Sequence, residues 1–518
     1  MPPRLLPPAL TALTALADRP AARALLCAAL GLAHALAFAP WQLPWLQWLA
    51  LSGLFALVLP IARARDAALA GFSFGLGWFG LGVSWIYVSM HVYGEMPALL
   101  AAAATAAFCA FLALYPALAL GLAVRLATGP ATRALLALPA AWAGSEWLRG
   151  VLLTGFPWLA GGYAHTDGPL AGYAPVLGVH GLTLVAALLA GSVALMARRP
   201  QRARLLAPAA CAAALLAGGQ ALRAVDWTQP QGEPLRVRLL QGNVPQNLKF
   251  ADGGMKLSEE AYLPLLRSEA QDDLVVLPES VFPLPLSYLP QATTDALAEV
   301  PRRGAALIFG IFIEEPRGHY FNSAVGLSPG GGAPQRYSKR HLVPFGEFIP
   351  WGFRWFVDML QMPIGDQQRG VSYQRPMQLA GQRIAVNICY EDLFGGEIRR
   401  AWSDPAQAPT VLLNVSNLGW FDDSLALAQH LQISRMRALE TGRPVLRATN
   451  TGATAIIDAR GNVVAQLPYL MRGVLSGEVQ GHRGDTPYLR LGDAPTLAAI
   501  VLGLVASGML GVRARRSR

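Results

Sequence analysis

Eight apolar stretches constrain this chain more than any other feature of its sequence. A helix that spans a bilayer needs roughly 20 apolar residues, because the hydrocarbon core is about 30 Å thick. The stretches cover residues 21–39, 43–62, 67–90, 97–124, 134–150, 172–196, 203–222 and 494–512. They predict a multi-span α-helical membrane domain with about seven helices in residues 1–222, and a C-terminal transmembrane helix at residues 494–512.

A long polar segment separates the last two stretches. The chain has 518 residues, of which 53% are hydrophobic and only 14% are charged, and most of its Lys, Asp and Glu residues fall between positions 228 and 490. Such an uneven distribution indicates two environments for one chain. We therefore expect a separate polar domain at residues 223–493 and a short basic cytoplasmic tail at residues 513–518.

Arginine clusters predict the orientation of the chain. They occur at Arg19 and Arg23, Arg63 and Arg65, Arg125 and Arg133, residues 198–204 and the C-terminal tail, whereas the intervening connections hold no Lys or Arg. Basic connections stay in the cytoplasm, so residues 223–493 are predicted to lie outside it. An alternative for the first stretch is a cleaved signal peptide, which leaves the polar domain on the same side.

The net charge of +10 is largely explained by these arginines, which touch anionic lipid at the cytoplasmic surface. No motif for nucleic-acid binding accompanies the charge, so we expect no nucleic-acid partner. The sequence has no CxxC pair, no histidine-rich metal spacing and no Walker motif. We expect neither a metal nor a cofactor.

Short runs rich in Val, Ile and Leu alternate with polar turns in the polar domain. They predict buried strands at residues 235–240, 274–277, 305–312, 384–388, 410–415 and 445–448. Residues 424–442 have the pattern of an amphipathic helix. Alternating strands and helices are typical of an α/β layered domain, and reacting groups in such domains gather where strands end.

Reactive side chains lie at three such positions. Glu279 follows the second predicted strand, where burial would raise its pKa and suit it to act as a general base. Lys339 supplies an ammonium group. Cys389, the only cysteine of the polar domain, ends the fourth strand ahead of an expected helix, where backbone N–H groups lower a thiol pKa.

Each of these residues also has an ordinary interpretation: a turn, a solvated lysine and a packing cysteine. Together they predict acyl transfer, with a carboxylate base, a thiolate nucleophile, and a cation and a backbone N–H that stabilise the oxyanion.

The motifs that carry these residues resemble the carbon-nitrogen hydrolase (nitrilase) superfamily. They are Leu-Pro-Glu279-Ser, the segment from Tyr337 to Glu347 around Lys339, and Asn-Ile-Cys389-Tyr-Glu391. With seven predicted spans before them and one after, the chain resembles the apolipoprotein N-acyltransferase family of Gram-negative bacteria. Further similar segments lie at residues 241–249, 417–421, 429–440 and 443–452, so the resemblance covers essentially the whole chain.

This resemblance implies an αββα nitrilase-like fold in the periplasm and the bacterial inner membrane as the location. It implies Glu279 as general base, Cys389 as the acylated nucleophile and Lys339 as the transition-state stabiliser. Glu347, Tyr390 and Glu391 match positions that support the site, and the Tyr390 backbone N–H is a second oxyanion donor.

The implied reaction passes through a thioester on Cys389. The phospholipid donor, phosphatidylethanolamine, gives an acyl chain that moves to the N-terminal α-amine of a diacylglyceryl-cysteine apolipoprotein, the final step of lipoprotein maturation. Phe250 departs from the family pattern, which has a Trp after Leu-Lys.

Aromatic residues predict contacts with lipid or substrate. These are Phe250, Phe345, Phe348, Trp351, Trp420 and Trp147. The 344–356 loop is aromatic enough to form a lipid-facing lid, and core packing is the alternative. Near the fifth stretch, Trp142, Glu146, Trp147 and Arg149 indicate either headgroup binding or anchoring at the membrane interface.

Two other functions remain open at this point. A membrane-tethered amidase would share the three residues but let water release the acyl group, and a lipid-binding scaffold would not need Cys389. The aromatic loop and the attached spans favour the acyltransferase, and the placement of all three reactive residues disfavours the scaffold.

Overall fold

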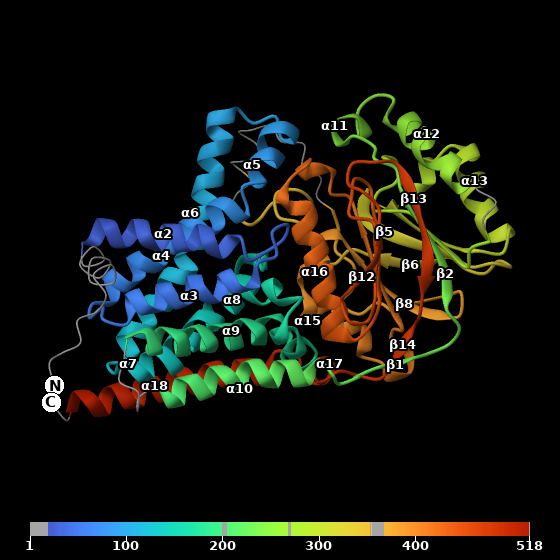
Figure 1. Ribbon diagram of the computed structural model, residues 1–518. Coiled ribbons are helices and arrows are strands. Elements are labelled where there is room, and N and C mark those ends of the chain that lie inside the picture. Colours follow the sequence, from blue (N-terminus) through green and yellow to red (C-terminus); the bar gives the residue numbers. More distant parts are fainter. Residues whose placement is uncertain are drawn as a thin grey trace. The chain divides into compact units, whose positions relative to one another are not determined.

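The computed structural model describes residues 19–198, 205–267, 271–316, 318–352, 354 and 367–516. The chain divides into two compact units (Figure 1). The first comprises residues 1–84, 99–225 and 493–518, and the second comprises residues 85–98 and 226–492. Residues 85–98 therefore group with the polar domain, although hydropathy placed part of them in the third span.

The first unit is helical throughout its apolar stretches. Its main helices are α2 (Pro20–Ala35), α3 (Pro44–Val58), α4 (Ala64–Gly82), α6 (Ala98–Leu126), α8 (Leu138–Val151), α9 (Ala174–Arg198), α10 (Leu206–Leu222) and α18 (Ala494–Arg516). Short turns of helix, α7 (Pro130–Thr132) and η2 (Arg133–Ala137), lead into α8. Each of the eight predicted stretches thus corresponds to a helix.

Among the described residues, three helices are long and apolar enough to cross a membrane: Ala98–Leu126, Pro169–Arg198 and Ala494–Arg516. A fourth is added if α4 and the segment Ile86–Tyr93, which are bent by 61° from each other, form one broken span. Because α2, α3 and α10 are shorter apolar helices, the number of crossings stays a prediction.

Glycines let α2 and α4 approach closely. A Cβ atom on Gly31 of α2 would lie 2.0 Å from the carbonyl oxygen of Phe74, and one on Gly77 of α4 would lie 2.0 Å from that of Ala28. Small residues at such contacts let helix backbones approach closely in lipid, where association depends on van der Waals packing because the hydrophobic effect between helices is absent.

The second unit contains two six-stranded sheets. One has the order β13-β2-β3-β4-β5-β6 and the other β12-β11-β10-β9-β8-β7. The bounds of the first are β13 (Gly473–Val479), β2 (Leu235–Gln241), β3 (Leu274–Val276), β4 (Ala306–Glu315), β5 (His319–Leu327) and β6 (Gln335–Ser338). Those of the second are β12 (Val463–Gln466), β11 (Ala455–Ile457), β10 (Val445–Thr449), β9 (Val411–Ser416), β8 (Gln382–Ile388) and β7 (Met377–Leu379). The central strands β2, β3 and β4, and likewise β8, β9 and β10, run parallel.

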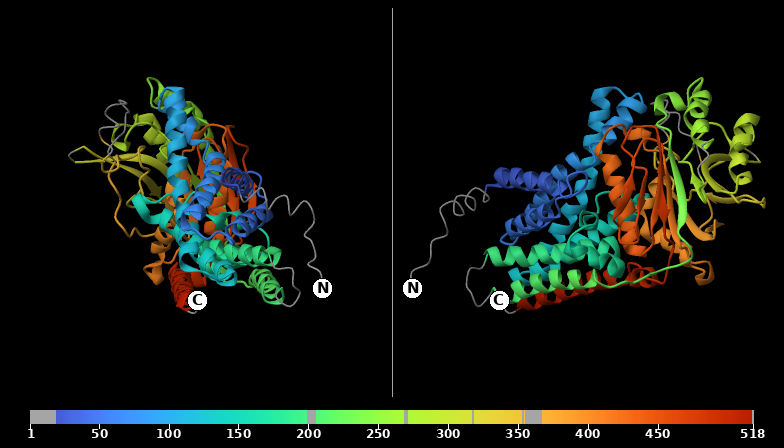
Figure 2. Two further views of the ribbon diagram at one scale, coloured as in Figure 1. Left: turned by 90° about the vertical axis from the view of Figure 1, so that its left-hand side faces the viewer. Right: turned by 45° about the vertical axis from the view of Figure 1, so that its right-hand side comes forward.

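Alternation along the strands builds three apolar layers. In β3, Leu274 and Val276 join a core with residues of the other sheet such as Leu413. Val275 points the opposite way, into a core that includes residues of α12 (Gly254–Leu266) and α13 (Gln291–Arg302). The second sheet is covered on its outer face by α16 (Leu425–Thr441), through Leu431 and Ala438. The result is an αββα sandwich, with the strands between α16 and the pair α12 and α13 (Figure 2).

All six predicted strands are present, and the helix predicted at 424–442 is α16. The expectation that α16 is amphipathic is wrong, because almost every residue from Ala426 to Thr441 is buried. Its polar side chains are held by partners instead: Ser434 donates a hydrogen bond to Asp392, and Arg435 Nε donates to the carbonyl of Gly461 at 2.7 Å.

Candidate active site

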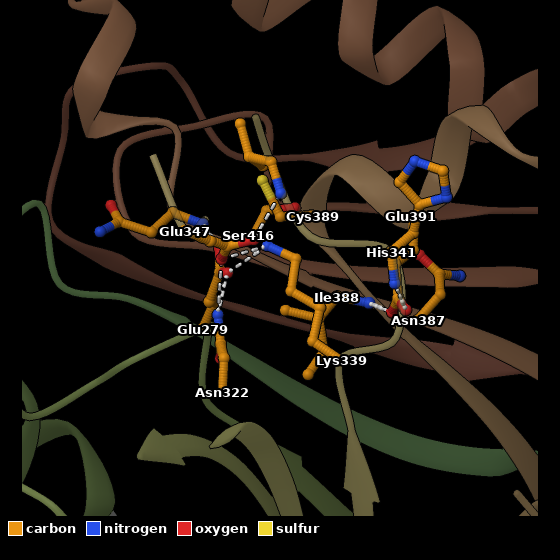
Figure 3. Close-up of polar contacts among 12 residues, drawn as sticks. Glu279, Asn322, Lys339, His341, Glu347, Asn387, Ile388, Cys389, Glu391 and Ser416 are labelled. Atoms are coloured by element: carbon orange, nitrogen blue, oxygen red, sulfur yellow. Dashed lines mark hydrogen bonds and ion pairs between the residues drawn. The ribbon is translucent and has the colours of Figure 1, made fainter. Parts of the chain in front are cut away.

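The ends of three strands bring the three reactive side chains together. Glu279 lies just beyond β3, Lys339 is the first residue after β6, and Cys389 is the first after β8. Figure 3 shows their side chains converging on one place in the second unit. Glu279 is 5% exposed and Lys339 is 1% exposed, so the carboxylate and the ammonium group meet away from bulk water.

A tight turn aims Glu279 at the site. The strand leaves its sheet at Leu277, whose N–H donates to the carbonyl of Ile308 at 2.9 Å, and Ser280 adopts a φ of 47°. Gly310 on β4 lies close to this turn. A Cβ atom on Gly310 would lie 2.6 Å from the Cα of Glu279. Only glycine accommodates this turn against β4.

Lys339 bridges two carboxylates. Its Nζ lies 3.1 Å from Glu279 Oε1 and 2.7 Å from Glu347 Oε1. Asn322 Nδ2 donates to the same two oxygens, at 2.7 Å and 3.2 Å. Burial tends to lower the pKa of Lys339, but the two carboxylates outweigh it and raise the pKa well above its ordinary value. The ammonium group therefore stays charged in the resting site.

Cys389 occupies a strained elbow between β8 and the turn of 3₁₀ helix η8 (Cys389–Leu393). Its φ is 52°, in the left-handed region that non-glycine residues rarely adopt. Its carbonyl is within hydrogen-bond distance of two donors, His430 Nε2 at 3.1 Å and Asn414 Nδ2 at 3.3 Å. Arg447 Nη2 donates to His430 Nδ1 at 2.6 Å, which leaves Nε2 to carry the proton.

The resting Cys389 thiol is protonated. Burial raises its pKa to about 12, and Glu279 adds to the shift, while Lys339 and a hydrogen bond from Ser416 oppose it. A thiol with this pKa would need a base in order to act as a nucleophile.

Glu391 ties the elbow to the segment that carries Lys339. Its Oε2 accepts from the N–H of Ile388 at 2.7 Å and the hydroxyl of Tyr337 at 2.9 Å. Its Oε1 accepts from the N–H groups of Arg340 at 2.7 Å and His341 at 3.1 Å. Burial raises the pKa of Glu391 to about 7, against the effect of the backbone donors. The carboxylate thus fixes Cys389 and Lys339 relative to each other.

The other predicted supporting residues also lie here. Glu347 Oε2 accepts from the N–H of Val343 at 2.8 Å. Tyr390 follows Cys389, is buried, and its ring packs edge-on against Phe394. These positions are the ones that the resemblance assigns to support of the site, and their roles stay predictions.

Sequence reasoning missed Asn322 and gave no role to Asn417. The Asn417 N–H donates to Glu279 Oε2 at 2.8 Å, so the carboxylate is held at both oxygens. Asn417 follows β9 and could have been found as another polar residue after a buried strand. Asn322 gave no such signal, because it lies inside β5, a strand that the hydropathy pattern did not reveal.

Most of the predicted aromatic contacts are partly or fully exposed. Trp351 is 98% exposed. Phe250, Phe345 and Trp420 are exposed to a lesser degree, and Phe348 is half-buried beneath the guanidinium group of Arg369. Trp420 also packs edge-on against Tyr93 of the 85–98 segment. Within the 344–356 loop, residues 353, 355 and 356 lie outside the described residues, so the lid stays a prediction.

The polar residues of α8 are enclosed within the first unit. Glu146 is 2% exposed and accepts from the N–H of Gly161 at 2.6 Å. Arg149 is 1% exposed and donates to the carbonyls of Phe156 and Trp158, both at 2.6 Å. Neither headgroup binding nor interfacial anchoring describes Glu146 and Arg149. Trp147 is half-buried and its predicted lipid contact is untested.

Within the described part of the chain, no group of three or more His, Cys, Asp or Glu side chains is arranged to hold a metal ion.

Comparison with known proteins agrees with this architecture. Residues 236–488 match the carbon-nitrogen hydrolase family model, so the second unit is a nitrilase-like domain. The chain is also similar to two solved structures: a carbon-nitrogen hydrolase from Helicobacter pylori (17% identical, TM-score 0.35, 48% of this chain and 90% of that one) and an amidase from Nesterenkonia (18% identical, TM-score 0.35, 51% and 96%).

Matches over the rest of the chain identify the protein family more closely. Residues 30–192 match the model of the apolipoprotein N-acyltransferase N-terminal domain. An apolipoprotein N-acyltransferase of Ralstonia nicotianae is 53% identical, over 93% of this chain and 92% of its own. Those of Bordetella bronchiseptica and Nitrosomonas europaea are 47% and 44% identical, each over 94% of this chain and 97% of its own. The chain therefore belongs to a family of acyltransferases. That family is the apolipoprotein N-acyltransferase family.

Proposed function

We propose that this protein transfers an acyl chain from phosphatidylethanolamine to the N-terminal α-amine of a diacylglyceryl-cysteine apolipoprotein. The observation that carries the proposal is the buried Glu279–Lys339 ion pair beside Cys389 at the strand ends. Family membership supports the lipoprotein acceptor, because the relatives named above are apolipoprotein N-acyltransferases. The apolar helices of the first unit fit substrates that reside in a bilayer.

In the first half-reaction, Cys389 Sγ attacks the ester carbonyl carbon of the phospholipid. Glu279 accepts the thiol proton and passes it to the leaving glycerol oxygen, so that an S–C bond forms while the ester C–O bond breaks. The products are a thioester and a lysophospholipid. The raised pKa of the Cys389 thiol makes this base necessary.

Negative charge that develops on the carbonyl oxygen is stabilised by hydrogen-bond donors that the fold holds in place. Lys339 supplies its ammonium group and Tyr390 its backbone N–H. Glu347 assists by holding Lys339 in its protonated form, through the contact at 2.7 Å. This charge is stabilised in a dry site, where each donor is worth more than in water.

In the second half-reaction, the neutral α-amine attacks the thioester. Glu279 accepts a proton from the amine nitrogen as the N–C bond forms, and this proton returns to the departing Cys389 sulfur. An amide and the free thiol result, so the two half-reactions form a ping-pong cycle that needs no nucleotide. The ester bond of the donor supplies the driving force through the thioester.

The proposal also covers the location of the protein and its contacts with lipid. We propose that the protein lies in the bacterial inner membrane with the second unit in the periplasm, and the arginine pattern and the family support this location. Trp351, Phe345 and Phe250 are exposed aromatic residues of this unit, and we propose that they contact lipid or the acyl chains. Half-buried Trp147 and Phe348, and exposed Trp420, are further proposed contacts.

The test uses purified full-length protein with phosphatidylethanolamine that carries a labelled sn-1 chain. Wild type is expected to acquire a label that hydroxylamine removes, Cys389→Ala to acquire none, and Glu279→Gln to acquire it about 100-fold more slowly or worse. A label that persists in Cys389→Ala, or the absence of label on folded wild type, would contradict the proposal. A scaffold would also keep lipoprotein maturation in cells that carry only Cys389→Ala.

A further inference from the structure

The short helix α11 (Gln246–Lys249) carries two buried donors that have no acceptor among the described residues. Lys249 is 0% exposed and its Nζ makes no hydrogen bond. Gln246 is 4% exposed and its Nε2 makes none either. Buried ammonium and amide groups are rarely left unpaired, because each loses its hydration without compensation. Two such donors on one helical turn can bind an acceptor that enters the site.

This turn adjoins the carboxylate proposed as the base. Gln246 Oε1 accepts from Asn417 Nδ2 at 2.7 Å, and the N–H of the same Asn417 donates to Glu279 Oε2 at 2.8 Å. Lys339 contacts the other oxygen, Oε1. Burial lowers the pKa of Lys249 to about 8, and the negative charge of Glu279 opposes that shift. Lys249 is thus a second cation near Glu279, and one without an ion-pair partner in the described structure.

The proposed chemistry indicates which part of the donor would approach Glu279 near Lys249 and Gln246. The carboxylate has to reach the glycerol oxygen that leaves, and in a glycerophospholipid the phosphate is attached to the same three-carbon backbone. A phosphate accepts several hydrogen bonds and pairs with ammonium groups. The flexible stem of lysine lets its Nζ move several ångströms toward such a group. Phe250, the next residue, is half-exposed, so α11 lies near the surface.

We propose that Lys249 Nζ and Gln246 Nε2 bind the phosphate of the acyl donor, and that they thereby select donors that carry an anionic glycerophosphate. This inference rests on the proposed function and adds a donor-recognition site to it. It assigns the two residues to binding of the group that leaves, so they act in the first half-reaction and not in transfer to the amine.

The experiment measures the rate of thioester formation on Cys389 of the full-length protein with three labelled donors of one acyl chain. They are phosphatidylethanolamine, the matching diacylglycerol, and a p-nitrophenyl ester that has no glycerol. Wild type is expected to react at least about tenfold faster with phosphatidylethanolamine than with diacylglycerol, since only phosphatidylethanolamine offers a phosphate to Lys249 and Gln246. Equal rates with these two donors would overturn the proposal without any variant.

Variants then test whether Lys249 and Gln246 cause the preference for phosphatidylethanolamine. Lys249→Met removes the charge, and Gln246→Glu keeps the acceptor for Asn417 while it replaces the donor with a carboxylate. Each is expected to slow the reaction with phosphatidylethanolamine at least tenfold more than the reaction with the p-nitrophenyl ester, which also reports whether the variant is folded. Lys256→Met, on the exposed face of α12 (side chain 80% exposed), is the matched control and should preserve the wild-type preference.

An equal loss with both donors would mean that Lys249 acts on Glu279, and no loss would mean that it binds nothing in this step. Either outcome overturns the assignment. If wild type forms no thioester with any donor, the proposed function itself fails, and this result is distinct from a change in donor preference.

Discussion

Cys389 combines the position of a proposed nucleophile with a pKa that disfavours the thiolate. It lies at a strained elbow, with a φ of 52°, and burial and the nearby Glu279 carboxylate raise its pKa to about 12. At pH 8 such a thiol is ionised to about one part in ten thousand. We therefore expect Cys389 to react slowly with general thiol reagents, and to react quickly only with a substrate in whose presence Glu279 acts as the base.

This leads to a prediction about alkylation. With a small neutral reagent such as iodoacetamide, the rate of modification of Cys389, read by peptide mass spectrometry, should keep rising with pH through pH 9. The raised pKa keeps the thiolate fraction growing tenfold per pH unit in that range. A rate that levels off below pH 8 would show an already ionised thiolate and would contradict the base role of Glu279.

Loss of Lys339 should lower the stability of the protein. Lys339→Met leaves the buried carboxylates of Glu279 and Glu347 facing each other without their cation, which is expected to cost about 3–5 kcal/mol. A fall in the thermal midpoint, followed by intrinsic fluorescence in detergent, measures the effect.

The double variant Lys339→Met/Glu347→Gln is expected to recover part of this stability, because it removes one of the two charges. Thioester formation should remain abolished in it, since the oxyanion still lacks Lys339. Unchanged stability in the single variant would mean that the ion pair contributes nothing.

At the level of elements, close packing of α2 on α4 depends on glycine. Gly77→Ala puts a methyl group against the backbone carbonyl of Ala28, 2.0 Å away, and should lower the free energy of unfolding by about 1–3 kcal/mol. Gly80→Ala, in the same helix, is the matched control because nothing lies within 4 Å of its added Cβ. It should be neutral or stabilise by about 0.5–1 kcal/mol. Equal thermal midpoints for the two variants would refute this packing.

Much of the second unit was predictable because its central strands are short, apolar and buried. Glu279 and Cys389 follow directly from that pattern, since each comes after such a strand, whereas Lys339 follows β6, a polar edge strand that the pattern did not predict. Strand β5 escaped prediction because its first residues, from His319 to Phe321, are polar or only partly buried. Asn322 matters only because β5 lies between β4 and β6, and no local pattern encodes that order.

Helix α16 shows a second limit. Polar residues on a helix normally indicate a solvent-facing side, but His430 and Ser434 are buried and bonded to Arg447, a residue of β10. Lys249 shows the same limit at the site: a lysine in a short polar segment predicts a surface position, and only the tertiary structure reveals that it is enclosed.

For the whole molecule, the central question is how one chain divides between lipid and water. Hydropathy located all eight helical stretches, but length decides which of them can cross a bilayer alone, and three helices meet that condition among the described residues. Glu146 and Arg149 could not be placed from sequence, because their burial depends on the loop from Phe156 to Gly161 folding over them.

Orientation gives a prediction at this scale. In intact cells, a cysteine introduced at exposed Lys256 should react with a maleimide reagent that cannot cross the inner membrane, whereas one introduced at Arg515 should react only after the membrane is opened. The positive-inside pattern is the reason. Labelling in the reverse order would contradict the proposed periplasmic location of the second unit.

The central claim is that an acyl group on Cys389 moves to an amine and not to water. The most direct measurement isolates the acylated enzyme free of phospholipid and adds a diacylglyceryl-cysteine peptide, with either a free or an acetylated N-terminus. We expect each acylated enzyme molecule to transfer one acyl group to the peptide with a free amine, and none to the acetylated peptide. Release of free fatty acid at one rate, whether or not the peptide is present, would identify a hydrolase and contradict the account.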